Sequence, residues 1–199
     1  MLWIALAAQL SAPEPKFMWL SIDDTPVKEL STRDFAVVRL RLTISPNGRV
    51  AGCDPEHASG NVRIDNYTCD LARRRALFEP ARSAEGAPSY GIHRVTVVWS
   101  KVPLDINPSG DLRAKLSSRP KGVHLPAVVR VMFAVSKAGQ ISGCTDEPPA
   151  LSGMKRNNPT LLPIACDQLV KNFRIGPAID ENGQPVESIQ NAAVVFTKE

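Results

Sequence analysis

The chain has 199 residues, of which 43% are hydrophobic and 22% are charged. This composition belongs to globular proteins that bury a core, so it excludes a wholly disordered chain, a collagen-like repeat and a protein with many membrane-spanning helices. The net charge of +4 is too small by itself to indicate nucleic-acid binding, and three histidines leave little material for a histidine-based metal or catalytic site.

The first residues, MLWIALAAQLSA, have features of a secretory signal. A short apolar stretch runs from Leu2 to Ala8, and Ala5 and Ala7 offer a small-residue cleavage site, although no basic residue precedes the stretch. It is far shorter than the roughly 20 apolar residues that a membrane-spanning helix needs. We therefore predict a signal peptide over 1–12 and a mature chain that begins near Ala8. The alternative is an ordinary N-terminal segment of a cytosolic protein.

An internal repeat covers most of the remaining sequence. The segment 36–53, AVVRLRLTISPNGRVAGC, aligns with 127–144, AVVRVMFAVSKAGQISGC, and eight of the 18 positions are identical. The second copy then contains a six-residue insertion. Beyond it, the two copies align again at a new constant spacing, with cysteine, proline and glycine residues at matching positions. Such self-similarity predicts a tandem duplication. We place the first domain at 17–100, a connector at 101–126 and the second domain at 127–199.

Each copy has the pattern of strand, strand, helix and strand. Apolar and polar residues alternate over 38–44, and an Asn-Gly turn then predicts a hairpin. The helices are expected over 65–78 and 160–173, and the closing strands over 92–99 and 189–196. This order predicts an α+β fold of two tandem modules, each a small antiparallel sheet with one helix packed on it.

Two smaller expectations concern residues outside the predicted cores. The connector is rich in turn residues, and Leu112–Leu116 is expected to form a helical turn within it. Arg39, Arg41 and Arg94 are placed on the outer faces of strands, where, if the protein is a structural scaffold with blocked edges, they serve only to guard sheet edges against pairing with other chains.

The four cysteines occupy matching positions in the two copies, one ending the second strand and one inside the helix. A helix packed on its own sheet can bring such cysteines within the roughly 4.4–6.8 Å between Cα atoms that a disulfide requires. We predict the bridges Cys53–Cys69 and Cys144–Cys166, which need an oxidising compartment. The first alternative is zinc bound by Cys53, His57 and Cys69, although the histidine has no counterpart in the second copy. Free buried thiols in a cytosolic protein are the second alternative.

These motifs resemble the C-terminal domain of TonB, the energy transducer. The features are VVRLRLTISPNGRVAGC, a Ser-Gly loop, a helix ending in Arg-Arg-Arg-Ala-Leu-Phe-x-Pro-Ala, a Gly-x-Pro and a closing VTVVW. The resemblance covers 36–99 and 127–196 and is weaker in the second copy. It implies a periplasmic protein that binds a protein partner, such as a segment of an outer-membrane receptor, by strand addition. The membrane anchor of a full transducer has no counterpart in this sequence, so we expect no integral membrane span.

The resemblance also places the partner-binding surface on the closing strand of the first copy, which keeps the fuller family pattern. The residues of this strand are Ile92, His93, Arg94, Val95, Thr96, Val97, Val98 and Trp99. No cofactor, metal or nucleic acid is expected.

Three other functions compete with protein binding. An anchorless structural scaffold would use the same fold with blocked edges. An enzyme is not expected, because the nucleophile elbow, the phosphate-binding glycine loop and the H-E-x-x-H helix are missing from the sequence, and Ser59 near His57 fits the family's Ser-Gly loop. A binder of peptidoglycan, lipid headgroups or nucleic acid could use Arg73–Arg75 and Arg82, although cations near a helix C-terminus also complement its dipole.

Overall fold

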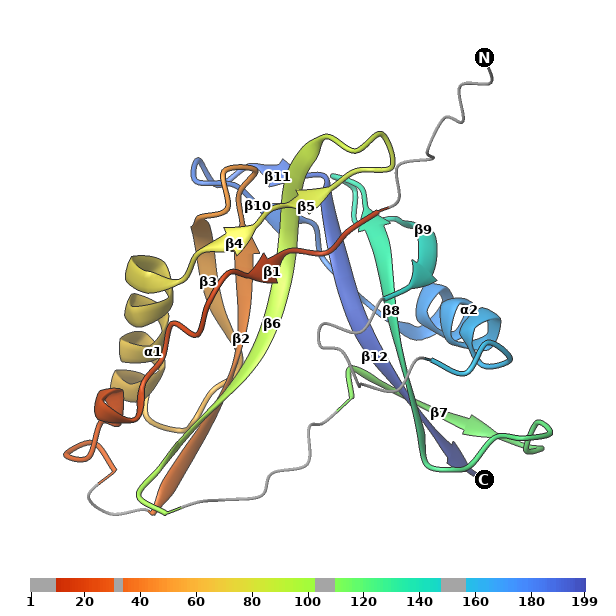
Figure 1. The fold of residues 1–199 in the computed structure, drawn as a ribbon, viewed down its shortest axis with the longest axis horizontal. Helices are drawn as coiled ribbons and strands as arrows, with labels where there is room; N and C mark the ends of the chain where they lie inside the picture. Colours follow the sequence, from red (N-terminus) through yellow and green to blue (C-terminus); the bar gives the residue numbers. More distant parts are fainter. Residues whose placement is uncertain (1–9, 31–33, 103–109, 148–156) are drawn as a thin grey trace.

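The computed structural model describes residues 10–30, 34–102, 110–147 and 157–199. Its long strands form one mixed sheet (Figure 1) in the order β3-β2-β6-β12-β8-β9. The first half of the chain supplies β2 (Phe35–Ile44), β3 (Val50–His57), α1 (Val62–Arg75) and β6 (Pro88–Ser100). The second half supplies β8 (Ala127–Val135), β9 (Ile141–Asp146), α2 (Leu162–Asn172) and β12 (Ser188–Lys198).

Short elements complete the fold around this sheet. A single 3-10 turn, η1 (Ile22–Asp24), precedes β2. Two short strands join the main sheet, β5 (Ala81–Arg82) beside β6 and β7 (Leu112–Leu116) beside β12. Two pairs stand apart from it, namely β1 (Glu14–Pro15) with β4 (Phe78–Glu79), and β10 (Ala178–Ile179) with β11 (Pro185–Val186).

This arrangement shows that the expected fold of two tandem α+β modules is wrong. The closing strands β6 and β12 pair in parallel, with Tyr90 opposite Ser188 and Gly91 opposite Ile189. In the described part of the chain, the strands of both halves therefore belong to one eight-stranded sheet, and the protein is mainly β. The alternation within each half predicts its strands, but it carries no information on how two sheets meet.

The helical turn expected in the connector is also wrong, because Leu112–Leu116 forms the strand β7. This strand runs parallel to β12, with Ala114 opposite Phe196. Leu112, Ala114 and Leu116 alternate with two basic residues, and the apolar members pack in the core beneath α2. A period of two is the period of a strand, and pairing with β12 satisfies its backbone.

The two helices lie on opposite faces of the sheet. Ile44 belongs to the core beneath α1 and pairs with Gly91, so Gly91 lies on the α1 face. Gly91 in turn pairs with Ile189, which alternates with the residues of β12 that pack beneath α2, among them Val194 and Phe196. The α1 face of the first half thus continues as the face of the second half that α2 leaves uncovered. A two-fold axis along the strands would produce this relation.

Both predicted disulfides are confirmed. Cys53 of β3 is bonded to Cys69 of α1, with the Cα atoms 5.7 Å apart, and Cys144 of β9 is bonded to Cys166 of α2, with a separation of 5.8 Å. The first bridge takes both sulfurs that the alternative zinc site would need, and no cysteine is a free thiol. Each bridge ties a helix to an outer strand of the sheet and closes a loop worth about 3 kcal/mol in the chain-entropy model.

Buried charges join the two halves beside the short β6–β12 pairing. Asp111 accepts a hydrogen bond from Arg39, and its Oδ1 lies 3.9 Å from Nε of Arg94. The other carboxylate oxygen of Asp111 accepts the backbone N–H of Ala193 at 2.7 Å. Arg94 also donates to the carbonyl of Asn191 at 2.9 Å. The side chains of Arg39, Arg94 and Asp111 are only 11%, 6% and 9% exposed, so this cluster is largely dry.

The three arginines that would guard sheet edges in the scaffold alternative make other contacts. Arg39 and Arg94 both pair with Glu56, at 3.5 Å and 2.9 Å. Arg41 donates to the carbonyl of Pro177, after α2, at 3.0 Å, and burial lowers the pKa of its guanidinium. These residues do lie opposite the helix of their own half, but the other half covers that face.

Replacing Asp111 with alanine should destabilise the protein strongly, because two buried arginines would lose a counter-charge and Ala193 would lose its acceptor. We expect the free energy of unfolding, measured by urea denaturation, to fall by about 3–5 kcal/mol. Asp54→Ala is the matched control, since Asp54 is 70% exposed and 3.9 Å from Arg41. Its loss should cost less than about 1 kcal/mol. Similar effects for the two variants would contradict a joining role for Asp111.

Candidate functional site

The strand predicted to bind a partner, 92–99, lies inside β6 near the middle of the sheet. One of its edges pairs with β2 along the whole segment. On the other edge the pairing with β12 stops at Gly91, and the side chain of Arg94 reaches across to the carbonyl of Asn191. The second closing strand, 189–196, pairs with β8 on one side and in part with β7 on the other. Neither closing strand is an outer strand of the sheet.

A different stretch of strand edge is open at the start of β2. The pairing of β3 with β2 begins only at Arg39, so the first residues of β2 extend beyond it. The carbonyl of Asp34 accepts the N–H of Lys101 on the β6 side. Because antiparallel strands alternate the direction of their backbone groups, the N–H and C=O of Phe35 and Val37 point to the opposite side. No strand in the described part of the chain pairs with them there.

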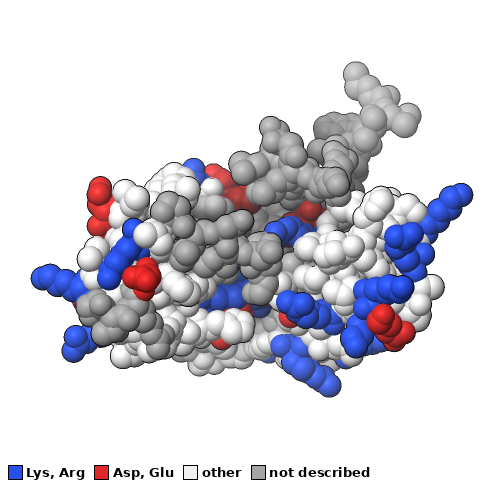
Figure 2. Space-filling model, turned by 90° about the horizontal axis from the view of Figure 1, so that it is seen from below, with Lys and Arg blue, Asp and Glu red and all other residues white. Residues whose placement is uncertain are grey.

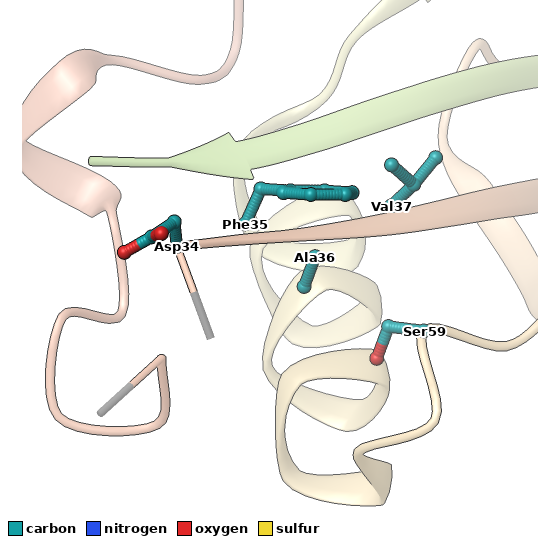
Figure 3. Close-up of a pocket in the computed structure, with 5 residues that line it drawn as sticks. All are labelled: Asp34, Phe35, Ala36, Val37 and Ser59. Carbon is teal, nitrogen blue, oxygen red and sulfur yellow. The ribbon is translucent and has the colours of Figure 1, made fainter. Parts of the chain in front are cut away.

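This open edge lines a groove of about 400 Å³ (Figure 3). Its walls are the segment 34–37 and Ser59. The side chains of Phe35 and Val37 lie on the same side of β2, whereas Ala36 points toward α1. Phe35 is 48% exposed. The groove therefore combines a large exposed apolar side chain with backbone donors and acceptors that pair with no described strand, which is the combination that an added strand needs.

The far wall of the groove is held by hydrogen bonds around Ser59. The N–H of Ser59 donates to Asp65 at 2.9 Å, and its hydroxyl donates to the carbonyl of Asn61 at 3.2 Å. The side chain of Asn61 accepts the N–H of Arg63 at 3.0 Å and so caps α1. This cap starts the helix at Val62, three residues before the predicted start, and so fixes the loop that lines the groove at the start of β2.

Two other groups of residues considered in the sequence make structural contacts. The Ser59 hydroxyl bonds the backbone two residues further on, and His57 ends β3 with its backbone opposite β2. At the end of α1, Arg75 forms an ion pair with Asp24 at 2.8 Å, and Arg73 lies 3.5 Å from a carboxylate of its own helix. These contacts account for both groups without a ligand.

The equivalent edge in the second half is covered at Arg130, whereas the pairing of β9 with β8 begins only at Val131, so Val128, which aligns with Val37, has no strand partner on that side among the described residues. At Arg130, which aligns with Arg39, the side-chain amide of Asn157 accepts the backbone N–H at 2.9 Å and donates to the carbonyl at 2.5 Å. The residue that aligns with Phe35 is Pro126, which has no N–H to offer. Proline and covering groups are devices by which edge strands avoid pairing with other chains. The proline was a signal of this difference that our sequence analysis missed.

Comparisons with protein-family models, with curated proteins and with solved structures found no match to this chain. The resemblance to the TonB C-terminal domain therefore rests on the sequence motifs alone. No helix in the described residues combines the length and the hydrophobicity needed to cross a membrane.

His93, within the predicted strand, is enclosed by the N-terminal segment rather than presented to a partner. Its ring lies 5.0 Å from that of Phe78, between centroids, and it is hydrogen-bonded to the backbone of Pro13. Burial lowers the pKa of His93 to about 4 and outweighs this hydrogen bond, which acts in the opposite direction. The imidazole is therefore neutral in the folded protein at pH 7.

Acid should destabilise the protein through His93. The histidine of the unfolded chain has a pKa of about 6.5. Between this pH and about pH 4 the unfolded state therefore binds a proton at His93 that the folded state does not bind. Stability should fall as the pH drops from about 6.5 to 4, by about 3 kcal/mol from this group. His93→Phe keeps a ring and removes the titration, so the loss between pH 7 and pH 4 in urea unfolding should be smaller in the variant. Identical losses would contradict the burial of a neutral His93.

Proposed function

We propose that this chain is a protein-binding module that captures an extended segment of a partner by strand addition at the start of β2. The observation that carries the proposal is that the N–H and C=O groups of Phe35 and Val37 beside an open groove pair with no strand in the part of the chain that the structure describes. Strand addition takes its affinity from main-chain hydrogen bonds and its specificity from alternate side chains. The TonB-like motifs support the same mode of binding, with a receptor segment as partner in envelope transport.

An added segment would continue the line of β3 along the uncovered part of β2. It would exchange backbone hydrogen bonds with Phe35 and Val37, between β2 and the wall at Ser59. Alternate side chains of the segment would lie beside the exposed Phe35 ring, and an apolar side chain there would remove that ring from water. The proposed partner is therefore an extended peptide with apolar residues at alternate positions.

A periplasmic location is part of the proposal. The two disulfides support it, because such bonds persist in oxidising compartments and are rare in the cytosol. The predicted signal peptide points the same way. Residues 1–9 lie outside the described residues. The last part of the predicted signal, 10–12, contacts the rest of the fold, because the backbone of Ser11 forms an antiparallel β-bridge with the backbone of Arg82.

The strand 92–99 remains a second candidate for the same function. Backbone groups of β6 point alternately toward β2 and away from it, and those of Thr96 and Val98 point away from β2. The start of β2 is favoured for two reasons. It lines a groove with an exposed aromatic side chain, whereas the free edge of β6 begins beside the buried Arg94 cluster.

Val37→Pro should abolish most of the peptide binding. Proline removes the N–H that points into the groove but leaves the β6 ladder intact, because the N–H of Val37 does not point toward β6. We expect an affinity loss of about tenfold, since one hydrogen bond is worth about 0.5–1.5 kcal/mol and the proline ring also blocks close approach. Fluorescence anisotropy with labelled peptides from the periplasmic segments of outer-membrane receptors measures this.

Two matched variants complete the experiment. Val128→Pro makes the same change at the aligned position of β8 and should leave the affinity unchanged. Thr96→Pro tests the strand 92–99, and circular dichroism checks that each variant is folded. Loss of binding with Thr96→Pro alone would move the site to β6. Unchanged binding by both first-half variants would contradict strand addition in this half.

A further inference from the structure

The positive charge of the chain is concentrated in one stretch of sequence. From Leu112 to Thr145 there are six Lys or Arg residues and no Asp or Glu. The net charge of the whole chain is only +4, so the rest of the sequence is slightly acidic. A surface built from this stretch therefore differs in sign from the remainder of the molecule.

The fold brings most of these side chains to one end of the second half. They lie on β7 and on the turn that follows it, and the last residues of β12 join them because Lys198 pairs with Leu116. All are exposed, and Figure 2 shows basic side chains on this side of the molecule. We call this surface the basic end, and its members are Arg113, Lys115, Arg119, Lys121 and Lys198.

The charges of the basic end are not neutralised within the described structure. The ion pairs formed among the described residues include none of its five basic side chains. The segments 112–122 and 197–199 contain one acidic side chain, Glu199. Alternation along β7 turns Arg113 and Lys115 outward while Ala114 is buried in the core. This contrasts with Arg73 and Arg75 of α1, which have carboxylate partners.

From this surface we infer a docking site for an anionic lipid bilayer. Five cations spread over one end of a molecule match a plane of phosphate headgroups, and each is worth about a fivefold gain in partitioning. Val195 of β12 pairs with Arg113 on one side and with Val128 on the other, so the side chains of Arg113 and Val128 lie on the same face of the sheet. Val128 is 51% exposed and offers an apolar contact to the bilayer surface. The segment 112–122 has no aromatic side chain on which the bases of single-stranded nucleic acid could stack.

Cosedimentation with lipid vesicles tests this inference on the full chain. The protein should bind vesicles of phosphatidylcholine with phosphatidylglycerol, should not bind pure phosphatidylcholine, and should be released by salt because ions screen exposed charges. Reversing two charges with Lys115→Glu and Lys121→Glu should lower the partition coefficient by at least about 25-fold.

The control variant makes the same change of net charge elsewhere, with Lys28→Glu and Lys137→Glu, which are exposed residues outside the basic end. It should bind like the unmodified chain, and circular dichroism should show both variants folded. An equal loss of vesicle binding in the two variants would overturn the inference. Equal binding to vesicles with and without phosphatidylglycerol would also overturn it. Tighter binding to heparin or duplex DNA than to anionic vesicles would replace the bilayer with a soluble polyanion. The outcome is separable from peptide binding, which Val37→Pro tests in the other half.

Discussion

The carboxylate of Asp111 connects the two halves of this protein where backbone pairing does not. The parallel pairing of β6 with β12 covers only two residues of each strand, which is too little to fix the position of one half on the other. Asp111 bonds Arg39 of the first half on one side and the backbone of Ala193 in the second half on the other. A buried ion cluster gains little net stability over an apolar contact, but breaking it is costly, so it favours one docked arrangement. The opposite placement of the helices and the identity of the outer strands depend on that arrangement.

The two halves differ in how their strand edges are covered. The outer strands β3 and β9 are each tied to a helix by a disulfide. In the second half the amide of Asn157 covers the backbone of Arg130, and Pro126 has no N–H to offer at the position of Phe35. Among the described residues, no side-chain amide covers the start of β2, which contains no proline and carries an exposed phenylalanine. An unprotected edge with an apolar side chain is an aggregation hazard unless a partner covers it. The exposed Phe35, whose counterpart in the second half is Pro126, therefore argues for binding at β2.

The sequence predicted those features that depend on local period or on one contact within a half. The alternation over 38–44 gives a strand, and cysteines at the ends of matching elements give the disulfides. The joining of the halves could not be predicted, because it uses two residues of each closing strand and no pattern marks them. Arg39 was expected at an outer face because alternation shows only that it lies opposite the helix, not what covers it. The open edge arises because β3 is too short to pair with the first residues of β2. Such relative strand lengths are difficult to predict from a single sequence. Pro126 at the position of Phe35 was the one visible sign of the open edge.

The groove at β2 is preorganised by its surroundings. The disulfide at Cys53 holds β3 to α1, and the capping bonds of Ser59 and Asn61 hold the loop between them, so a bound segment has to order little beyond itself. Figure 1 also places the start of β2 and the strand β7 toward the same side of the molecule. A bilayer bound at the basic end would therefore face the same side of the molecule as the open edge. Segments that emerge from membrane-embedded partners would then be presented to the groove at a high effective concentration, and two weak contacts would act as one stronger attachment.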